Sequence, residues 1–175
     1  MKTVLQLTIM VLLSLVVSCT KHTQPVQSAS REKEAQAQPT TSPASTDRGT
    51  PAEAQAMLRK AVEHYNDVGR KQALADFTGR KPAFFDRDLY VVCISPNHIT
   101  TANGGFPQYV GSTVDGLRAE NGKPIGKAIY DATSSTGEAS VKYFWINPVS
   151  GKTEPKIGFF QKVGEDVCGV GAYNP

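Results

Sequence analysis

Two aromatic side chains and one lysine near the C-terminus have the types and spacing of a site for a small molecule. Tyr143 and Trp145 are two residues apart in an alternating stretch that predicts a β-strand, so both rings should lie on one face. Lys156 follows at the start of the next predicted strand, where its ammonium group could pair with a carboxylate. A simpler interpretation also fits, in which the rings are core aromatics under a long helix and Lys156 is a solvated strand-end lysine.

Three more side chains are candidates for hydrogen bonds from the opposite wall of such a site. Asn103 and Tyr109 belong to a glycine-studded segment, 103–123, that carries too many aromatic residues for a plain linker. Long loops inside a compact domain are usually functional or poorly ordered. Tyr130 lies on a helix predicted just after this segment. Together these residues would give a mostly apolar cavity with a few convergent donors, which is the usual composition of a ligand site.

The sequence lacks the motifs of the common catalytic and metal sites. His64 and His98 are the only histidines after Pro51, no serine stands in a nucleophile-elbow sequence, and no CxxC or HExxH motif occurs. The 14 basic and 13 acidic residues from Pro51 onward give no electrostatic footprint for nucleic acid. We therefore expect no enzymatic activity, no cofactor, no metal and no nucleic-acid partner.

The N-terminus has the pattern of an export signal. Lys2 precedes an apolar run that is shorter than the roughly 20 residues needed to span a bilayer. The run ends in Leu15-Val16-Val17-Ser18-Cys19, which resembles the cleavage box of bacterial lipoproteins. This resemblance implies a signal peptide over residues 1–18, acyl chains such as palmitate on Cys19, and a membrane anchor. The alternative is an ordinary signal peptide with an incidental cysteine.

The residue after the cysteine bears on the location of such a lipoprotein. Thr20, rather than aspartate, resembles the sorting signal for the outer membrane in enteric bacteria. We therefore expect an outer-membrane lipoprotein that faces the periplasm, with the inner membrane as the alternative. Residues 19–50 are rich in Gln, Ser, Thr, Ala and Pro, so they cannot bury enough apolar surface to offset their ordering entropy. They predict a disordered tether between Cys19 and one folded domain, residues 51–175.

The domain predicts a mixed α+β fold. Thr50-Pro51-Ala52-Glu53 has the residues of a capped helix start, and Gly69 is a natural end for that helix. Two further helices are expected, over residues 71–77 and 124–137. Strands are expected at 88–95, 98–102, 139–146, 156–163 and 166–173, and the last three should form an antiparallel meander.

With its parts in this order, the stretch from about Ala54 to Tyr173 resembles a single Cache domain of the second type, an extracytoplasmic sensor module. The residues that carry the resemblance are Phe85-Asp86-Arg87-Asp88-Leu89-Tyr90-Val91-Val92, Ala102-Asn103-Gly104, Tyr109-Val110-Gly111, the strand from Val141 to Pro148, Lys156, and Gly169-x-Gly171-x-Tyr173. The resemblance implies a long N-terminal helix on a PAS-like five-stranded antiparallel sheet of order 2-1-5-4-3. It also implies a pocket for small ligands, often short carboxylates, between the sheet and the loop before the third strand.

Several positions depart from the family pattern. Many members carry a histidine where this chain has Asn103, and an amide can donate a hydrogen bond but cannot become charged. An acid ligand would thus lose one cation here. Many members also have a glycine in the first hairpin, where this chain has Asn97-His98. Members usually continue into a transmembrane helix and a signalling domain, whereas this chain stops at Pro175, so we expect any signal to be passed in trans.

The implied strand order makes Cys93 and Cys168 members of neighbouring strands. A disulfide can form if the two residues face each other as a close pair, and the exported compartment can be oxidising. The alternative is that both are small buried apolar residues.

These expectations combine into one hypothesis and one alternative. The hypothesis is a lipid-anchored extracytoplasmic protein of the sensor type that binds a small organic acid or a similar metabolite. The alternative is a structural or assembly lipoprotein with the same fold and no occupied pocket, which contacts another envelope protein through its surface.

Overall fold

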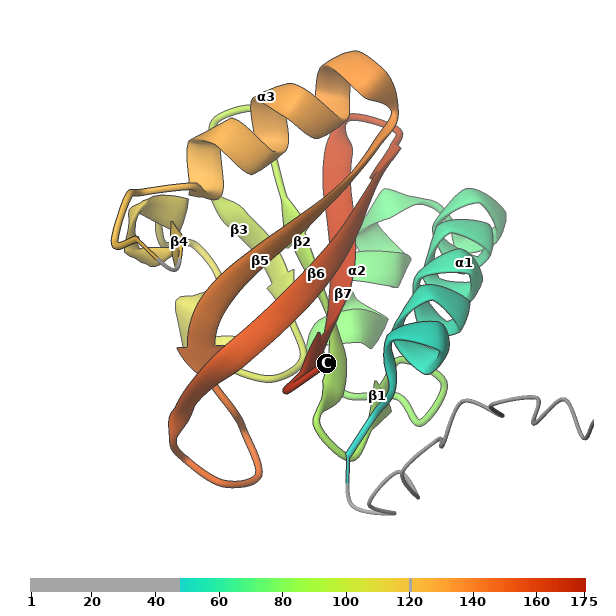
Figure 1. Cartoon of the computed structure of the whole chain (residues 1–175). Helices are drawn as coiled ribbons and strands as arrows, with labels where there is room; N and C mark the ends of the chain where they lie inside the picture. Colours follow the sequence, from blue (N-terminus) through green and yellow to red (C-terminus); the bar gives the residue numbers. More distant parts are fainter. Residues whose placement is uncertain (1–47, 120) are drawn as a thin grey trace, which may run out of the picture. The chain divides into compact units, whose positions relative to one another are not determined.

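The computed structural model describes residues 48–119 and 121–175. They form an antiparallel sheet with helices on both of its faces (Figure 1). The fold class is therefore the mixed α+β class predicted from the sequence. The predicted signal peptide, Cys19 and the tether up to residue 47 lie outside the described residues. Within the described ranges, no helix combines the length and the hydropathy that a membrane crossing requires.

Helix α1 (Pro51–Val68) starts and ends where its capping residues predict. Glu53 N donates to Thr50 Oγ1 at 3.2 Å, and Thr50 N donates to Glu53 Oε2 at 2.8 Å, so both halves of the capping box are present. Gly69 ends α1 with a positive φ of 79°, and α2 (Arg70–Thr78) follows at once. The sharp change of direction at Gly69 lets α1 and α2 pack on the same side of the sheet.

Seven strands form the sheet, and all of their pairings are antiparallel. They are β1 (Phe85–Asp86), β2 (Leu89–Ile94), β3 (Thr100–Asn103), β4 (Arg118–Ala119), β5 (Glu138–Ile146), β6 (Thr153–Val163) and β7 (Asp166–Tyr173). Their order is β1-β2-β7-β6-β5-β4, and β3 also pairs with β2. The five longer strands follow the implied order, but the expectation of five strands in total was wrong. The additional strands β1 and β4 have 2 residues each, too few to show a periodic pattern.

Each face of the sheet has its own apolar core. On one face, α1 and α2 pack on Val91 and Cys93 of β2 and on Val170 of β7. On the other face, α3 (Gly126–Thr136) packs on the sheet together with the segment around Val114. Alternate residues of β2 and β7 point to opposite faces, so both strands are covered twice, as expected for β2. Figure 1 shows α1 and α3 on separate sides of the sheet.

A disulfide joins the two central strands of the sheet. Cys93 of β2 and Cys168 of β7 are directly opposite each other, with Cα atoms 4.0 Å apart, and their sulfur atoms are bonded. Of the two alternatives that the sequence left open, the bridge is therefore the one that the structure shows. Both cysteines belong to the core under α1, so the bridge lies on the sheet face opposite to α3.

The chain enters the domain before the predicted boundary at residue 51. Gly49 N donates to the buried carboxylate of Asp88 at 2.7 Å, and the guanidinium of Arg48 pairs with both carboxylate oxygens of Glu154. The Asn147 amide donates to Asp88 at 3.1 Å and to Glu154 at 3.2 Å, which links the two carboxylates. Arg48 and Gly49 therefore pack with the domain, whereas the sequence placed them in the tether.

Candidate functional site

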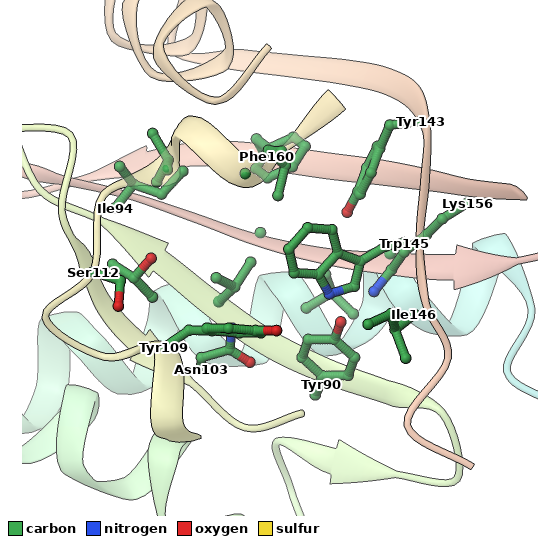
Figure 2. A pocket seen from close by; sticks show the side chains of 18 of the residues that line it. Tyr90, Ile94, Asn103, Tyr109, Ser112, Tyr143, Trp145, Ile146, Lys156 and Phe160 are labelled. Carbon is green, nitrogen blue, oxygen red and sulfur yellow. The ribbon is translucent and has the colours of Figure 1, made fainter. Parts of the chain in front are cut away.

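A cavity of about 450 Å³ lies between the sheet and the glycine-studded segment. Its floor is the sheet face opposite to α1, and its roof runs from Tyr109 to Leu117. The lining residues are Tyr90, Val92, Ile94, Thr100, Asn103, Tyr109, Ser112, Thr113, Val114, Gly116, Leu117, Tyr143, Trp145, Ile146, Lys156, Phe160, Gly169, Val170 and Gly171. Figure 2 shows this cavity from close by.

Lys156 lies at one end of the cavity and is buried, with 3% of its surface exposed. Its Nζ lies 4.0 Å from the ring centroid of Tyr90 and 4.2 Å from that of Tyr173. Nζ also donates to the Tyr173 hydroxyl at 3.1 Å, and that hydroxyl donates to the carbonyl of Ile146 at 2.6 Å. The interpretation of Lys156 as a solvated strand-end lysine was therefore wrong.

Two glycines of β7 make the space that buried side chains of β6 occupy. A β-carbon on Gly171 would lie less than 3.0 Å from Lys156 Cε, and one on Gly169 would lie equally close to the ring of Phe160. Real β-carbons do not approach so closely. Because the two glycines give β7 no side chains at these positions, the aliphatic stem of Lys156 and the ring of Phe160 can lie across this strand. The Gly-x-Gly-x-Tyr pattern at the end of the chain thus positions the ammonium group.

Burial dominates the electrostatics of Lys156. It lowers the pKa of the ammonium group well below the ordinary value of 10.5, while the charge of Asp88 acts weakly in the opposite direction. The side-chain oxygens of Asp88 accept from Gly49 N and Asn147 instead. No carboxylate of the described residues lies within 4.0 Å of Lys156 Nζ. The cavity therefore holds a desolvated amine without an acidic partner among the described side chains.

Tyr143 and Trp145 share the cavity face, as the strand parity predicts. Tyr143 is buried beside Lys156, its cross-strand partner, and burial raises the pKa of its hydroxyl well above the usual value. Trp145 is half-buried and packs edge-on against Tyr109, with ring centroids 5.9 Å apart. The alternative that the long helix covers these rings was wrong, because α1 packs on the other face of the sheet.

Two of the three residues proposed for the opposite wall line the cavity. Asn103 ends β3, where its Oδ1 accepts from Phe106 N at 2.8 Å and its amide nitrogen has no protein partner among the described residues. Tyr109 stands on a short 3₁₀ helix, η1 (Pro107–Tyr109), that forms part of the roof. Figure 2 shows both side chains along the same wall as Tyr90.

Tyr130 does not line the cavity, so its inclusion in the predicted site was wrong. Its hydroxyl donates to the carbonyl of Glu165 at 2.9 Å, and its ring packs edge-on against His98 with centroids 5.3 Å apart. The residue is part of the core that fixes α3 to the sheet. Helical spacing placed Tyr130 on the domain side of α3 but could not show whether its hydroxyl reached the cavity.

Sequence reasoning missed several lining residues, and Tyr90 and Ser112 are the most informative. Tyr90 shares the inward parity of Val92 and Ile94 on β2, and this signal could have placed it in the cavity. Ser112 belongs to an irregular part of the roof, where no periodicity indicates direction. Within the parts of the chain that the structure describes, no group of three or more His, Cys, Asp or Glu side chains is arranged to hold a metal ion.

The loop that carries Asn103 into the roof is held by an arginine. Arg80 donates from Nε to the carbonyl of Gly104 at 2.6 Å and from Nη2 to that of Gly105 at 2.9 Å. A β-carbon on Gly105 would lie 2.6 Å from the ring of Tyr90, so only glycine fits between the loop and that ring. Arg80 and the two glycines therefore fix Asn103 and Tyr90 at the same wall.

Comparisons with known proteins agree with this fold. The sequence matches the family model for single Cache domain 2 over residues 34–172. Among solved structures, it is similar to a methyl-accepting chemotaxis protein from Vibrio parahaemolyticus, with a TM-score of 0.58, 20% identity, and coverage of 70% of this chain and 86% of that one. No curated protein matches the sequence.

Two further solved structures share the fold. One is a periplasmic sensor domain of a chemotaxis protein, with a TM-score of 0.59, 24% identity, and coverage of 71% of this chain and 94% of that one. The other is a Cache chemosensory domain described as recognising carboxylic acids, with a TM-score of 0.54, 16% identity, and coverage of 71% and 88%. At these identities, the likeness concerns the fold.

Proposed function

Since the chain belongs to the single Cache domain 2 family, we propose that it is an extracytoplasmic binding protein of the sensor type whose ligand is a small organic acid. The observation that carries this proposal is Lys156, a buried amine at the end of a cavity of about 450 Å³. Pockets of this size, with apolar walls and a few convergent polar groups, are the usual sites for small ligands.

The burial of Lys156 is costly unless something offsets it. Removal of a lysine side chain from water, without a carboxylate partner, destabilises its charged form. The lowered pKa of Lys156 reflects this cost. The electron-rich faces of Tyr90 and Tyr173 recover part of it. A ligand carboxylate beside Nζ would supply the missing charge, and the carboxylic-acid ligands of one structural relative support this choice.

The remaining polar groups suit a ligand that lies along the sheet. Asn103 can donate its amide hydrogens from the end of β3, while Tyr109 and Trp145 offer their rings to an apolar body. None of these groups is placed for bond making or breaking, since no nucleophile with an adjacent base lines the described cavity. The arrangement therefore supports binding rather than catalysis.

Isothermal titration of the full chain with a panel of carboxylates tests the proposal. We expect at least one acid to bind, and Lys156→Ala to weaken that binding by more than about tenfold. Lys162→Ala is the matched control, because Lys162 lies on the same strand and is exposed. Uniform silence across the panel, or equal affinity of the wild type and Lys156→Ala, would contradict the proposal and favour a protein that acts through its surface.

We further propose that Cys19 carries acyl chains that anchor the domain to the membrane, with the residues up to 47 as a tether. The support is the sequence Leu15-Val16-Val17-Ser18-Cys19 alone. An anchored domain would pass its signal to another envelope protein. Mass spectrometry of the mature N-terminal peptide tests the anchor: we expect a lipid-modified Cys19, and Cys19→Ala should release the protein from membranes. An unmodified Cys19 in a membrane-bound protein would refute it.

A further inference from the structure

We infer that the cavity selects a monocarboxylate with an apolar body larger than that of acetate, and rejects acids that carry an ammonium group or a second carboxylate. The inference rests on the proposed function and adds the charge and size of the ligand. It follows from four features of the cavity: one cation, no acid, neutral donors at the far end, and a roomy apolar middle.

The absence of an acidic side chain excludes amino acids. Among the described residues that line the cavity, Lys156 is the one charged side chain, and no Asp or Glu contributes. Asp88 does not line the cavity, and its oxygens accept from Gly49 N and from the Asn147 amide. Asp115 belongs to the roof segment but does not line the cavity, and its exposed carboxylate accepts from the Thr113 hydroxyl at 2.8 Å. An ammonium group in the cavity would lose its hydration without gaining an acidic partner. The free-energy cost of this desolvation is larger than that of a neutral group in the same place.

The far end of the cavity is polar but neutral. Figure 2 shows Ser112 and Lys156 at opposite ends, with Trp145 between them. Thr100, Ser112 and Asn103 offer hydroxyl and amide groups, which can bond a hydroxyl or carbonyl oxygen of a ligand. None of them carries a charge, so a second carboxylate placed there would gain no cation, and beside the buried Thr100 and Asn103 it would lose part of its hydration. Dicarboxylates should therefore bind more weakly than monocarboxylates of the same length.

The volume and the walls set the size of the ligand body. A cavity of about 450 Å³ falls in the range of about 300–1,000 Å³ that is usual for sites of drug-sized ligands. Acetate would leave most of this space to water. Val92, Ile94, Val114, Leu117 and Phe160 make the middle of the cavity apolar. Each methylene group that is buried there should improve affinity by roughly fourfold.

Matched pairs of acids test the charge rule and the size rule separately. Hexanoate and adipate have the same chain length and differ by one carboxylate. The acids 3-phenylpropionate and phenylalanine share a carbon skeleton and differ by one ammonium group. Acetate and hexanoate differ in apolar body alone. We would titrate the full chain with these five acids by calorimetry at pH 7, and repeat each titration with Lys156→Met to subtract binding that does not involve the amine.

Hexanoate and 3-phenylpropionate should bind at least about tenfold more tightly than adipate, phenylalanine and acetate, and Lys156→Met should weaken the binding of hexanoate and of 3-phenylpropionate by more than about tenfold. If adipate, phenylalanine or acetate binds as tightly as its matched partner, the inference is overturned while the proposed carboxylate site stands. If no acid binds to the wild type, the proposed function itself fails, and the inference fails with it. The two failures are thus distinguishable in one experiment.

Discussion

The stem of Lys156 lies in the space that a β-carbon on Gly171 would occupy, since such an atom would come within 3.0 Å of Lys156 Cε. The two residues belong to paired strands, β6 and β7, and Lys156 itself pairs with Tyr173. A glycine on one strand therefore sets the direction of a lysine on its neighbour. The ammonium group reaches the rings of Tyr90 and Tyr173 because nothing on β7 obstructs its stem.

Gly171→Ala should move the ammonium group and so weaken acid binding by more than about tenfold. The new methyl group would collide with Lys156 Cε and would also lie 2.9 Å from the carbonyl of Ile157, so we expect a loss of about 1–3 kcal/mol of stability as well. Calorimetric titration together with urea unfolding measures both effects.

Gly116→Ala is the matched control for this substitution. Gly116 also lines the cavity, but a β-carbon there would meet nothing within 4 Å. We expect this variant to keep the wild-type stability and to change the affinity less than Gly171→Ala does. If Gly171→Ala folds and binds acid as tightly as Gly116→Ala, the position of Lys156 does not depend on Gly171, and our account of the site is wrong on this point.

Lys156→Met should lose acid binding. At pH 7 its free energy of unfolding should equal that of the wild type or exceed it by up to about 4 kcal/mol. Burial lowers the pKa of Lys156 in the folded state, so the unfolded chain holds more protons between that lowered pKa and about 10.4. Wild-type stability should therefore fall, relative to Lys156→Met, as the pH is lowered through this window. Urea unfolding of both proteins from pH 7 to pH 10 measures the gap.

Lys162→Met separates this effect from a general loss of charge. Lys162 lies on the same strand as Lys156 and is exposed, so its replacement should not change the pH dependence of stability. A purely structural role for Lys156, through its contacts with Tyr90 and Tyr173, predicts the opposite sign. In that case Lys156→Met would be less stable than the wild type at pH 7.

Acid binding should become weaker as the pH rises through the lowered pKa of Lys156. A bound carboxylate stabilises the charged amine, so above the free-state pKa binding must take up a proton and affinity should fall by up to about tenfold per pH unit. Tyr90, Tyr143 and Tyr173 face the same region, but burial raises the pKa of each above its usual value, so they stay neutral in this range. Calorimetry in buffers with different ionisation enthalpies measures the uptake.

A titration in which affinity is constant from pH 6 to pH 10 would show that Lys156 is charged in the free protein throughout. It would also show that ligand binding involves no change in the protonation of Lys156. Lys156→Met provides the reference, because any residual affinity of this variant should not vary with pH in the same way.

Local patterns were sufficient to predict the elements and much of the site. The capping box at Thr50 and the alternation around Tyr143 and Trp145 depend on neighbouring residues only, so α1 and the shared face of the two rings followed from them. The pairing order of the longer strands came from the family resemblance. Two-residue strands such as β1 and β4 carry no period, and they could not be predicted this way.

Properties that depend on distant contacts could not be predicted. The burial of Lys156 depends on Gly171 and on the ring of Tyr90, which lies 66 positions away in the chain. The exclusion of Tyr130 from the cavity depends on the carbonyl of Glu165, which its hydroxyl reaches across the fold. Likewise, the composition around Arg48 placed this residue in the tether. Its partner Glu154 lies far along the chain on β6, so no local pattern could indicate their ion pair.

The disulfide between Cys93 and Cys168 should stabilise the domain without supporting the ligand site. It closes a loop with a sequence separation of 75 residues, for which the chain-entropy model gives about 4 kcal/mol, and often less is realised. Both cysteines face the core under α1, whereas the cavity lies on the other face of the sheet. The double variant Cys93→Ala/Cys168→Ala should therefore lose about 2–4 kcal/mol of stability in urea unfolding and keep its affinity for acids at a temperature where it is folded.

Reduction of the wild type provides the matched comparison. The intact mass of the wild-type protein should rise by two hydrogen atoms on reduction, as the reductant supplies two electrons and water two protons. Its unfolding midpoint should fall toward that of the double variant, which itself should not respond to reductant. The central strands β2 and β7 also supply Tyr90 and Gly171 to the cavity. A loss of acid binding in the folded double variant would therefore contradict the prediction. It would mean that the bridge holds these two strands at the spacing that the Lys156 site requires.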